Sequence, residues 1–530
     1  MTAARAGSLD ELPSLVPRGE AVRVERTAPG TRAVLAVDAL GCARSALEVP
    51  GGWELSDLPP ATYEIQALGA QGRRDTTHVV IPRWPGDSPV PAFATELSDT
   101  RGAERALGWL RSMRATLVQV YDWMKSYSDP EPPPGPYRDP LGRALDGRVL
   151  SRLTRGVGEL GAVAQAYAPV LAADADWARS HRDEVLRQND GVDEHLGEIL
   201  TIMHPGRPPF LAHWLATYGQ AARLGFTGLH LDTYGYPRVP RDGASNPVDM
   251  RAAYTAFLDR VRRALPGMFL TFNQVNGHPG ALELPGPSMA RYVEVWPPNS
   301  GWRHLEGLLL RAGARGSEPR ILAIYPPDWS DRRGALDGAM RTLAVACLMG
   351  ADVMMLGGDG GLLFDPYYPR HVTLTAPERR RVLVWHRFTL SVRDLFRRGE
   401  DTSWEEVTGP GGSVEVRTRV AAGPEPGSGL LVRVRRGEGW LAVGLVNLTG
   451  SARGLWTEPC GPARPVPASV GALLDDPERY RARVTALGAE AADGVDLRLE
   501  ATERGTVAWV DLPAVRTFTV VVFKRPGARL

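Results

Sequence analysis

The alternation of hydrophobic and polar residues divides the chain into three regions. Residues 20–95 contain short segments such as TRAVLAVDA and HVVIPRW, separated by glycine and proline. A period of two residues predicts strands with one buried face, because successive side chains point to opposite faces of a sheet. Residues 399–530 show the same period, for example in GLLVRVRR and TFTVVVFK. We therefore expect an immunoglobulin-like β-sandwich over residues 1–95 and a second β-sandwich over residues 399–530.

The middle region, residues 96–398, alternates short apolar segments with longer segments of helical period, which is typical of repeated βα units. Eight such units within about 300 residues are compatible with a (β/α)₈ TIM barrel. The predicted fold class is therefore α/β, a TIM barrel flanked by two β-sandwich domains. The eight candidate strands end at or near Trp123, Tyr167, His204, Asp232, Asn273, Trp296, Tyr325 and Gly358.

The overall charge excludes several kinds of partner. The 530 residues include 62 Lys and Arg against 61 Asp and Glu, a formal net charge of +1. Such a balance provides no positive field that would hold nucleic acid or an anionic membrane. No segment approaches the roughly 18 apolar residues that a membrane span requires, and the first residues lack the apolar core of a secretory signal. We expect a cytoplasmic protein with no nucleic-acid or membrane partner, and its oligomeric state stays open.

Cysteine and histidine usage gives no indication of a bound metal. The three cysteines, Cys42, Cys347 and Cys460, are too few and too scattered for a disulfide framework or a zinc site. The glycine-rich GGDGG at 357–361 lacks the GxGxxG spacing of a dinucleotide-binding turn. We expect neither a metal nor another cofactor.

Polar and aromatic residues gather at the ends of the predicted strands. In a TIM barrel the active site lies at the carboxyl ends of the strands, where the βα-loops converge. Carboxylates, amides and aromatic rings suit a carbohydrate site, since they supply acids, hydrogen-bonding groups for hydroxyls and flat surfaces for sugar rings. The residues at these ends are Asp122, Tyr167, Asp232, Asn273, Glu294, Trp296, Tyr325 and Asp359.

Two of these carboxylates are the candidate catalytic pair. Asp232 ends the fourth predicted strand, and Glu294 lies two βα units later, near the end of the sixth. Alternation along the sixth strand puts Tyr292, Glu294 and Trp296 on one side. Hydrolysis of a glycosidic bond needs two carboxylates that flank the bond. The alternative is that Asp232 caps a helix and Glu294 forms a structural ion pair.

The other six residues are candidate substrate-binding groups. Asn273 could hydrogen-bond to a sugar hydroxyl or to the nucleophile, and Trp296 and Tyr325 are candidate stacking surfaces. Asp122 has a helix-capping alternative, and the glycines around Asp359 also suit a turn with positive φ. The six are Asp122, Tyr167, Asn273, Trp296, Tyr325 and Asp359.

Six segments together resemble glycoside hydrolase family 66, the dextranases and cycloisomaltooligosaccharide glucanotransferases. They occur in the expected order: VQVYDW (118–123), GFTGLHLDTYG (225–235), LTFNQVNG (270–277), YVEVW (292–296), ILAIYPP (321–327) and FDPYYP (364–369). The resemblance implies retaining hydrolysis of α-1,6-glucosidic links in dextran or isomalto-oligosaccharides, with endo action. It also implies that Asp232 is the nucleophile and Glu294 the acid/base, whose pKa should be raised by burial and by the charge of Asp232.

Two departures from the family refine this expectation. The segment after VQVYDW reads MKSYSDPEPPP, where the family usually has a basic, His-containing stretch. The segment from Tyr325 to Ala351 is too short for the inserted carbohydrate-binding module of the glucanotransferases, which favours a dextranase-like hydrolase. The alternatives are a transglycosylase that forms linear or cyclic isomalto-oligosaccharides, and a barrel that binds carbohydrate without turnover.

Overall fold

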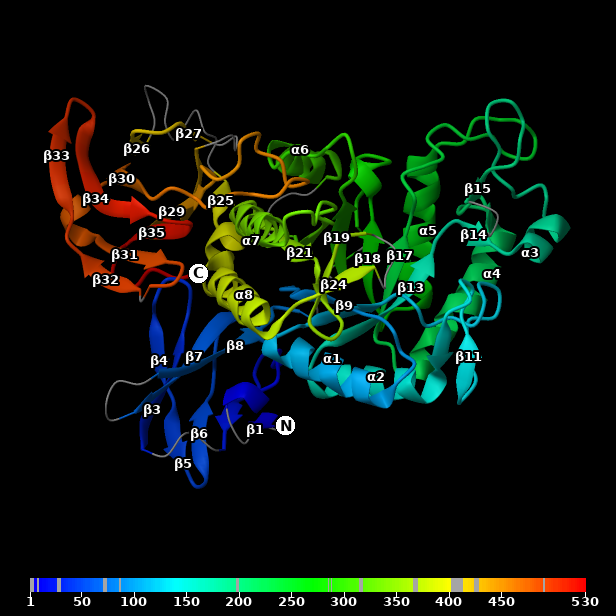
Figure 1. Ribbon diagram of the computed structural model, residues 1–530, viewed down its shortest axis with the longest axis horizontal. Coiled ribbons are helices and arrows are strands. Elements are labelled where there is room, and N and C mark those ends of the chain that lie inside the picture. Colours follow the sequence, from blue (N-terminus) through cyan, green and yellow to red (C-terminus); the bar gives the residue numbers. More distant parts are fainter. Residues whose placement is uncertain are drawn as a thin grey trace.

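The fold is built around one curled sheet (Figure 1). The computed structural model describes residues 4–6, 9–25, 30–69, 74–84, 87–196, 200–284, 286, 288–313, 318–365, 370–401, 413–423, 429–489 and 491–530. Residues 366–369 of the FDPYYP segment therefore lie outside the described residues. Figure 1 shows the N-terminal strands (blue) and the C-terminal strands (red) on the same side of the central α/β region.

The central sheet has eleven strands in the order β21-β20-β19-β18-β17-β13-β10-β9-β22-β23-β24. From β21 to β22 along this order all pairs are parallel. Only Met355 separates β21, which pairs with β20, from β22, which pairs with β9. One continuous segment, β21 to β22, therefore pairs with β20 at one end of the row of parallel strands and with β9 at the other. The parallel strands are β9 (Pro91–Ala94), β10 (Leu117–Val120), β13 (Val163–Pro169), β17 (Gly228–Asp232), β18 (Phe269–Asn273), β19 (Met289–Glu294), β20 (Arg320–Ala323), β21 (Asp352–Met354) and β22 (Leu356–Gly357). The antiparallel strands β23 (Gly361–Leu363) and β24 (His371–Thr373) extend it.

Helices follow most of these strands. Several begin after an aspartate whose side chain accepts backbone N–H groups of the first turn, as at Asp99, Asp146, Asp249 and Asp331. Between β18 and β19 lies the short 3₁₀ helix η3 (Val275–Gly277). A short helix, α3 (Ala175–Ser180), lies in the connection from β13 to α4. The other α-helices are α1 (Thr100–Ser112), α2 (Gly147–Glu159), α4 (Pro208–Tyr218), α5 (Met250–Ala264), α6 (Arg303–Arg311), α7 (Arg332–Leu348) and α8 (Ala376–Arg398). Among the described residues, no helix combines the length and apolar character needed to cross a bilayer.

Alternate residues of each parallel strand fill the interior of the curled sheet. In β18, Phe269 joins an apolar cluster with Tyr292 and other buried side chains. Two residues further, Thr271 hydrogen-bonds to His230 at 2.8 Å. After two more residues, Asn273 reaches the carboxyl edge of the sheet. Because side chains alternate along a strand, Phe269, Thr271 and Asn273 lie on the same face of β18, from the core to the carboxyl edge.

One of the eight expected strands does not belong to the sheet, and one strand of the sheet was not expected. Strand β9 belongs to the sheet but lies before residue 96, where we expected the sheet to begin; with only four residues, all buried, it shows no alternation. The segment ending near His204 does not join the sheet. Its strand β16 (Leu200–Ile202) pairs antiparallel with β14 (Ala172–Ala173) and β15 (His195–Leu196) within the long connection from β13 to α4. An apolar run of three residues carries no information about which sheet it joins.

Two pairs of smaller sheets flank the curled sheet, each pair around its own apolar cluster. The N-terminal sheets are β1 (Ala4–Ala6), β2 (Val22–Val24), β6 (Gly52–Leu55) and β5 (Leu47–Val49), and β4 (Ala43–Ser45), β3 (Thr31–Val37), β7 (Ala61–Gly69) and β8 (Arg74–Ile81). The first C-terminal sheet contains β25 (Glu400–Asp401), β28 (Leu430–Gly437), β29 (Trp440–Asn447), β35 (Phe518–Lys524), β31 (Arg481–Ala486), β32 (Ala492–Val495) and β27 (Ala422–Gly423). The second contains β26 (Val414–Thr418), β30 (Val466–Leu473), β34 (Gly505–Val515) and β33 (Arg498–Thr502).

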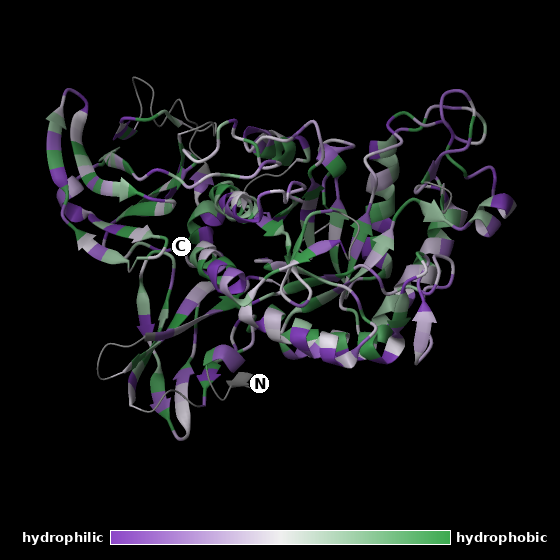
Figure 2. Cartoon of the chain, viewed as in Figure 1, coloured by the Kyte–Doolittle hydropathy of each residue, from purple (hydrophilic) through white to green (hydrophobic). Residues whose placement is uncertain are grey.

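Helix α8 connects these parts. It contacts both β7 and β28, and Figure 2 shows hydrophilic and hydrophobic residues mixed along its length. The buried Arg393 donates to Asp352 of β21 at 3.1 Å and to Thr62 Oγ1 of β7 at 3.1 Å. Asp394, also buried, accepts from the backbone N–H of Thr62 at 2.6 Å. A polar contact through one helix therefore joins the N-terminal sheets to the curled sheet.

Candidate active site

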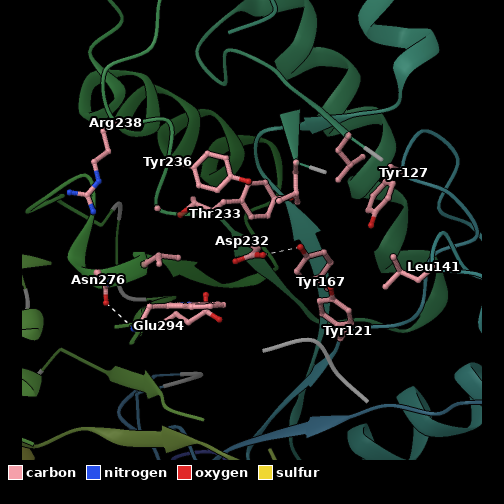
Figure 3. Close-up of a pocket in the computed structure, with 16 residues that line it drawn as sticks. Tyr121, Tyr127, Leu141, Tyr167, Asp232, Thr233, Tyr236, Arg238, Asn276 and Glu294 are labelled. Carbon is pink, nitrogen blue, oxygen red and sulfur yellow. Dashed lines mark hydrogen bonds between the residues drawn. The ribbon is translucent and has the colours of Figure 1, made fainter. Parts of the chain in front are cut away.

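A pocket of about 540 Å³ lies at the carboxyl ends of the parallel strands (Figure 3). Its walls come from the segments that follow β10, β13, β17, β18 and β19. The lining residues are Tyr121, Tyr127, Leu141, Tyr167, Leu196, Leu200, Asp232, Thr233, Tyr234, Gly235, Tyr236, Arg238, Val275, Asn276, Glu294 and Trp296. Both carboxylates predicted to be catalytic are among them.

Asp232 is fixed by hydrogen bonds from the two neighbouring strands. It is the last residue of β17. The Tyr167 hydroxyl, on β13, donates to Asp232 Oδ2 at 2.8 Å, and Asn273 Nδ2, on β18, donates to Asp232 Oδ1 at 2.7 Å. With both oxygens engaged, the carboxylate has a defined orientation in the pocket (Figure 3).

A single amide group joins the two carboxylates. Asn273 Nδ2 also donates to Glu294 Oε2 at 2.9 Å, and Asn273 Oδ1 accepts from the Glu294 backbone N–H at 3.3 Å. The arrangement follows from the strand order, because β18 lies between β17 and β19. Asn273, Asp232 and Glu294 are each the last residue of their strand.

Burial raises the pKa of both carboxyl groups. The pKa of Asp232 rises to about 6, and hydrogen bonds from Asn273, Tyr167 and the Thr233 backbone oppose the rise. The pKa of Glu294 rises to about 7, first through burial and then through the negative charge of Asp232. Glu294 therefore holds its proton to higher pH than Asp232, although the two titrate as a pair.

The layer beneath the two carboxylates is polar but uncharged. His230 Nε2 lies 4.0 Å from Asp232 Oδ1, and its Nδ1 is bonded to Thr271. Burial lowers the pKa of His230 to about 3, so this ring is neutral at ordinary pH. The Tyr292 ring contacts it, with centroids 4.6 Å apart. Among the described residues, no cation beneath Asp232 therefore offsets the free-energy cost of ionising its carboxyl group.

Aromatic side chains surround the pair. The Tyr121 and Tyr167 rings are 4.6 Å apart on the Asp232 side. Trp296, which is 37% exposed, lines the Glu294 side, and its backbone N–H donates to Asn276 Oδ1 at 2.9 Å. Asn276 adopts a positive φ of 51°, as suits an asparagine in a turn, and its side chain also fixes the position of Trp296.

The structure brings together six of the eight residues predicted from strand ends. Asp232, Glu294, Tyr167 and Trp296 line the pocket, and Asn273 and Tyr325 lie behind it and hydrogen-bond to Glu294.

Asp122 and Asp359 do not line this pocket. Asp122 follows Tyr121, which does line it, and alternation turns Asp122 away; its buried carboxylate accepts from Thr95 Oγ1 at 3.0 Å and from the Glu96 backbone N–H at 2.9 Å. Asp359 forms ion pairs with Arg105 and, at 3.6 Å, with Arg379.

Several lining residues were not predicted. Tyr234 and Tyr236 lie two and four residues after Asp232, and Tyr121 lies two residues before Trp123, so alternation continued beyond the strand would have found them. Tyr127, Leu141, Leu196 and Leu200 belong to long connections and leave no local pattern. In the part of the chain that is described, no group of three His, Cys, Asp or Glu side chains is arranged to hold a metal ion.

Comparison with protein families identifies the family of this chain. The sequence model of Glycosyl hydrolase family 66 matches residues 62–473. Among curated protein sequences, none matches the chain significantly.

Solved structures of carbohydrate-active enzymes share the fold. A cycloisomaltooligosaccharide glucanotransferase from Paenibacillus sp., complexed with cycloisomaltoheptaose, has a TM-score of 0.77 at 14% identity, over 96% of this chain and 98% of that chain. An alpha-amylase from Geobacillus thermoleovorans, complexed with acarbose, has a TM-score of 0.53 at 11% identity, over 84% of this chain and 100% of that chain. At these identities the likeness concerns the fold. Since the family model covers most of the chain, this protein belongs to glycosyl hydrolase family 66.

Proposed function

We propose that this protein is a retaining glycoside hydrolase that cleaves α-1,6-glucosidic links of isomalto-oligosaccharides or dextran. Asp232 attacks the anomeric carbon while Glu294 protonates the departing glycosidic oxygen. Glu294 then removes a proton from water, which attacks the same carbon and releases Asp232. The observation that carries the proposal is the Asn273 amide that holds both carboxylates at one pocket.

The spacing of the carboxylates supports retention. Asp232 Oδ1 and Glu294 Oε2 are bonded to the same nitrogen at 2.7 and 2.9 Å, so their separation cannot exceed the sum of these distances. This limit applies to the two oxygen atoms, and it is compatible with the about 5–5.5 Å between carboxyl groups of retaining glycosidases. Inverting enzymes need roughly 6.5–9.5 Å to admit a water molecule.

The order of protonation supports the assignment of roles. A general acid must hold a proton at the working pH, whereas a nucleophile must be ionised. Glu294 has the higher pKa, because the charge of Asp232 adds to the effect of burial. Asp232, with a pKa of about 6 against about 7 for Glu294, ionises first as pH rises, which favours Asp232 as nucleophile.

The linkage and the architecture belong to the same proposal. Family membership and the likeness to a glucanotransferase of cycloisomaltooligosaccharides favour α-1,6-linked glucose. We further propose that the curled sheet is a (β/α)₈ TIM barrel, flanked by two β-sandwich domains and beginning at β9. The pairing of β21 with β20 and of β22 with β9 supports a closed barrel.

Product analysis tests the proposed function. The protein should release sugar from isomaltotetraose and not from α-1,4- or β-linked glucans, and proton NMR should detect the α-anomer first. Initial release of the β-anomer would contradict the covalent route. Products longer than the substrate would instead favour the alternative of a transglycosylase, to which the glucanotransferase likeness points.

A further inference from the structure

The two carboxylates indicate which side of the pocket receives the leaving group. A nucleophile attacks the anomeric carbon from the face opposite the leaving oxygen, and the general acid has to reach that oxygen. In the proposed mechanism the leaving group therefore lies away from Asp232 and next to Glu294. Figure 3 shows Arg238 and Asn276 on this side of Asp232, and Tyr167 on the other side.

Arg238 brings a positive charge to the leaving-group side. It belongs to the connection from β17 to α5, lines the pocket and is exposed. Within the described ranges, no hydrogen bond or ion pair engages its guanidinium group; Asp242, in the same connection, is already paired with Arg207 at 3.0 Å. After the larger effect of burial, the charge of Arg238 lowers the pKa of His278, so the guanidinium group is close to the turn that follows Asn276. It is available to a ligand there.

The neighbouring side chains also donate hydrogen bonds. Asn276 Oδ1 already accepts from the Trp296 backbone N–H at 2.9 Å, so the Nδ2 amide group is the part of this side chain left for a ligand. Behind the same turn, Arg311 donates to the Asn276 carbonyl at 3.3 Å and adds a second positive charge. The Trp296 ring, 37% exposed, offers a flat surface without an acceptor.

This set of donors favours an anionic ligand. Of the residues that line the pocket in the described part of the chain, only Asp232 and Glu294 have carboxylates, and the reaction uses both. The hydroxyl groups of a neutral sugar donate as well as accept, so a neutral sugar is best held by acceptors and donors together. A carboxylate or phosphate only accepts, and a guanidinium group matches either of them with two parallel N–H bonds.

We infer that the leaving group of the substrate carries a carboxylate or a phosphate, and that Arg238 and the Asn276 amide bind this anionic group. The inference rests on the proposed function and narrows it, because glucose is then removed from an α-1,6 link to an acidic unit. The chemical steps are unchanged. The bond between the anomeric carbon and the glycosidic oxygen breaks, a bond to Asp232 forms, and the proton of Glu294 goes to the departing oxygen. Water then replaces Asp232, returns a proton to Glu294 and releases glucose.

Two pairs of α-1,6-linked glucosides test the inference. Isomaltobionate and isomaltitol share an open-chain leaving unit and differ only in a carboxylate against a hydroxymethyl group. Isomaltose 1-phosphate and isomaltose differ only in the phosphate. We expect kcat/KM to be roughly tenfold higher or more for the anionic member of at least one pair, as charge-assisted hydrogen bonds provide. The pair that shows the preference identifies the group as carboxylate or phosphate.

Two other outcomes separate the inference from the proposed function. Cleavage of the neutral members at equal or higher kcat/KM in both pairs would overturn the inference and leave the proposed function intact. Failure to cleave any α-1,6-linked glucoside, together with an activated aryl α-glucoside, would overturn both.

Variants of Arg238 provide the second arm. Because Arg238 is exposed, Arg238→Ala should fold, and we expect it to reduce the preference for the anionic substrate roughly tenfold, mainly through KM. Arg238→Lys keeps the charge and should retain part of the preference. The matched control is Arg260→Ala, an exposed arginine of α5 that does not line the pocket, which should leave the preference unchanged. An unchanged preference in folded Arg238→Ala would overturn the role of Arg238.

Discussion

At the scale of single residues, the Asn273 amide organises the site. It donates to both carboxylates, and these hydrogen bonds lower the pKa of each. Asn273→Ala should therefore move the acid limb of the kcat/KM profile to higher pH and reduce kcat/KM by roughly 10²–10³-fold, as losses of a positioned donor do. The check is a pH–rate profile on an aryl α-glucoside.

The control for this substitution is Asn246→Ala, an exposed asparagine that does not line the pocket. It should leave both the profile and the rate unchanged. An Asn273→Ala enzyme with a lower rate but an unshifted acid limb would indicate a purely structural role for the amide.

Glu294 should destabilise the folded protein at neutral pH. The pKa of Glu294 is about 7 in the folded protein, above its ordinary value of 4.5. Between these two pH values Glu294 ionises readily only in the unfolded chain, so the free energy of unfolding falls as pH rises. Glu294→Gln removes that loss. We expect no gain in stability at pH 4 and a gain of about 1–3 kcal/mol at pH 8. Calorimetric unfolding at the two pH values checks this; a variant less stable at pH 8 would contradict it.

The sequence located the two acids but not all of their neighbours. Alternation along a strand correctly brought Glu294 and Trp296 to one pocket. After β10, the side-chain direction expected from the sequence was wrong by one residue. Tyr121 therefore lines the pocket and Asp122 does not. The ion pairs of Asp359 with Arg105 and Arg379 join segments far apart in sequence, which no local pattern reveals.

At the scale of elements, closure of the sheet depends on Gly357. A Cβ added there would lie 2.2 Å from the Phe93 carbonyl oxygen of β9, so a side chain must push β22 away from β9. Gly357→Val should destabilise the protein by about 1–3 kcal/mol or more, seen as a lower Tm. Gly158→Ala is the matched control: nothing lies within 4 Å of its added Cβ, and alanine favours helix α2. If the Gly357→Val and Gly158→Ala variants were equally stable, pairing of β22 with β9 would not depend on Gly357.

Strand length shows why most strands of the sheet were predictable while β9 and β16 were not. Longer strands such as β13 and β19 carry enough residues for their character to be recognised. Strand β9 has four residues and β16 has three, and neither length records which partner it pairs with. The partner is decided by closure of the whole sheet and by pairing within the connection from β13 to α4.

At the scale of the whole molecule, α8 joins the N-terminal sheets to the curled sheet. Asp394→Ala would leave the Thr62 N–H and the guanidinium of Arg398, 3.8 Å away, without their buried partner. Removing one side of such a contact costs about 3–5 kcal/mol. Glu415→Ala, at an exposed pair with Arg417, should cost about 0–1 kcal/mol. Thermal unfolding with limited proteolysis checks both, and similar losses would contradict a special role for Asp394.

The division of the chain into a central α/β region and two outer β regions was predictable, because the change from a period of two to helical period extends over hundreds of residues. The contacts between the regions were not predictable. Arg393 and Asp394 of α8 meet Thr62 across more than 300 positions of sequence, and only the folded chain brings them together.

The most direct test of the central claim is to trap the glycosyl-enzyme intermediate. The protein is incubated with 5-fluoro-α-glucosyl fluoride, digested, and analysed by tandem mass spectrometry. We expect one sugar bound covalently to the carboxylate of Asp232, and no label on the Asp232→Ala variant. A label on another carboxylate, or steady turnover with no covalent adduct and release of the β-anomer, would contradict it.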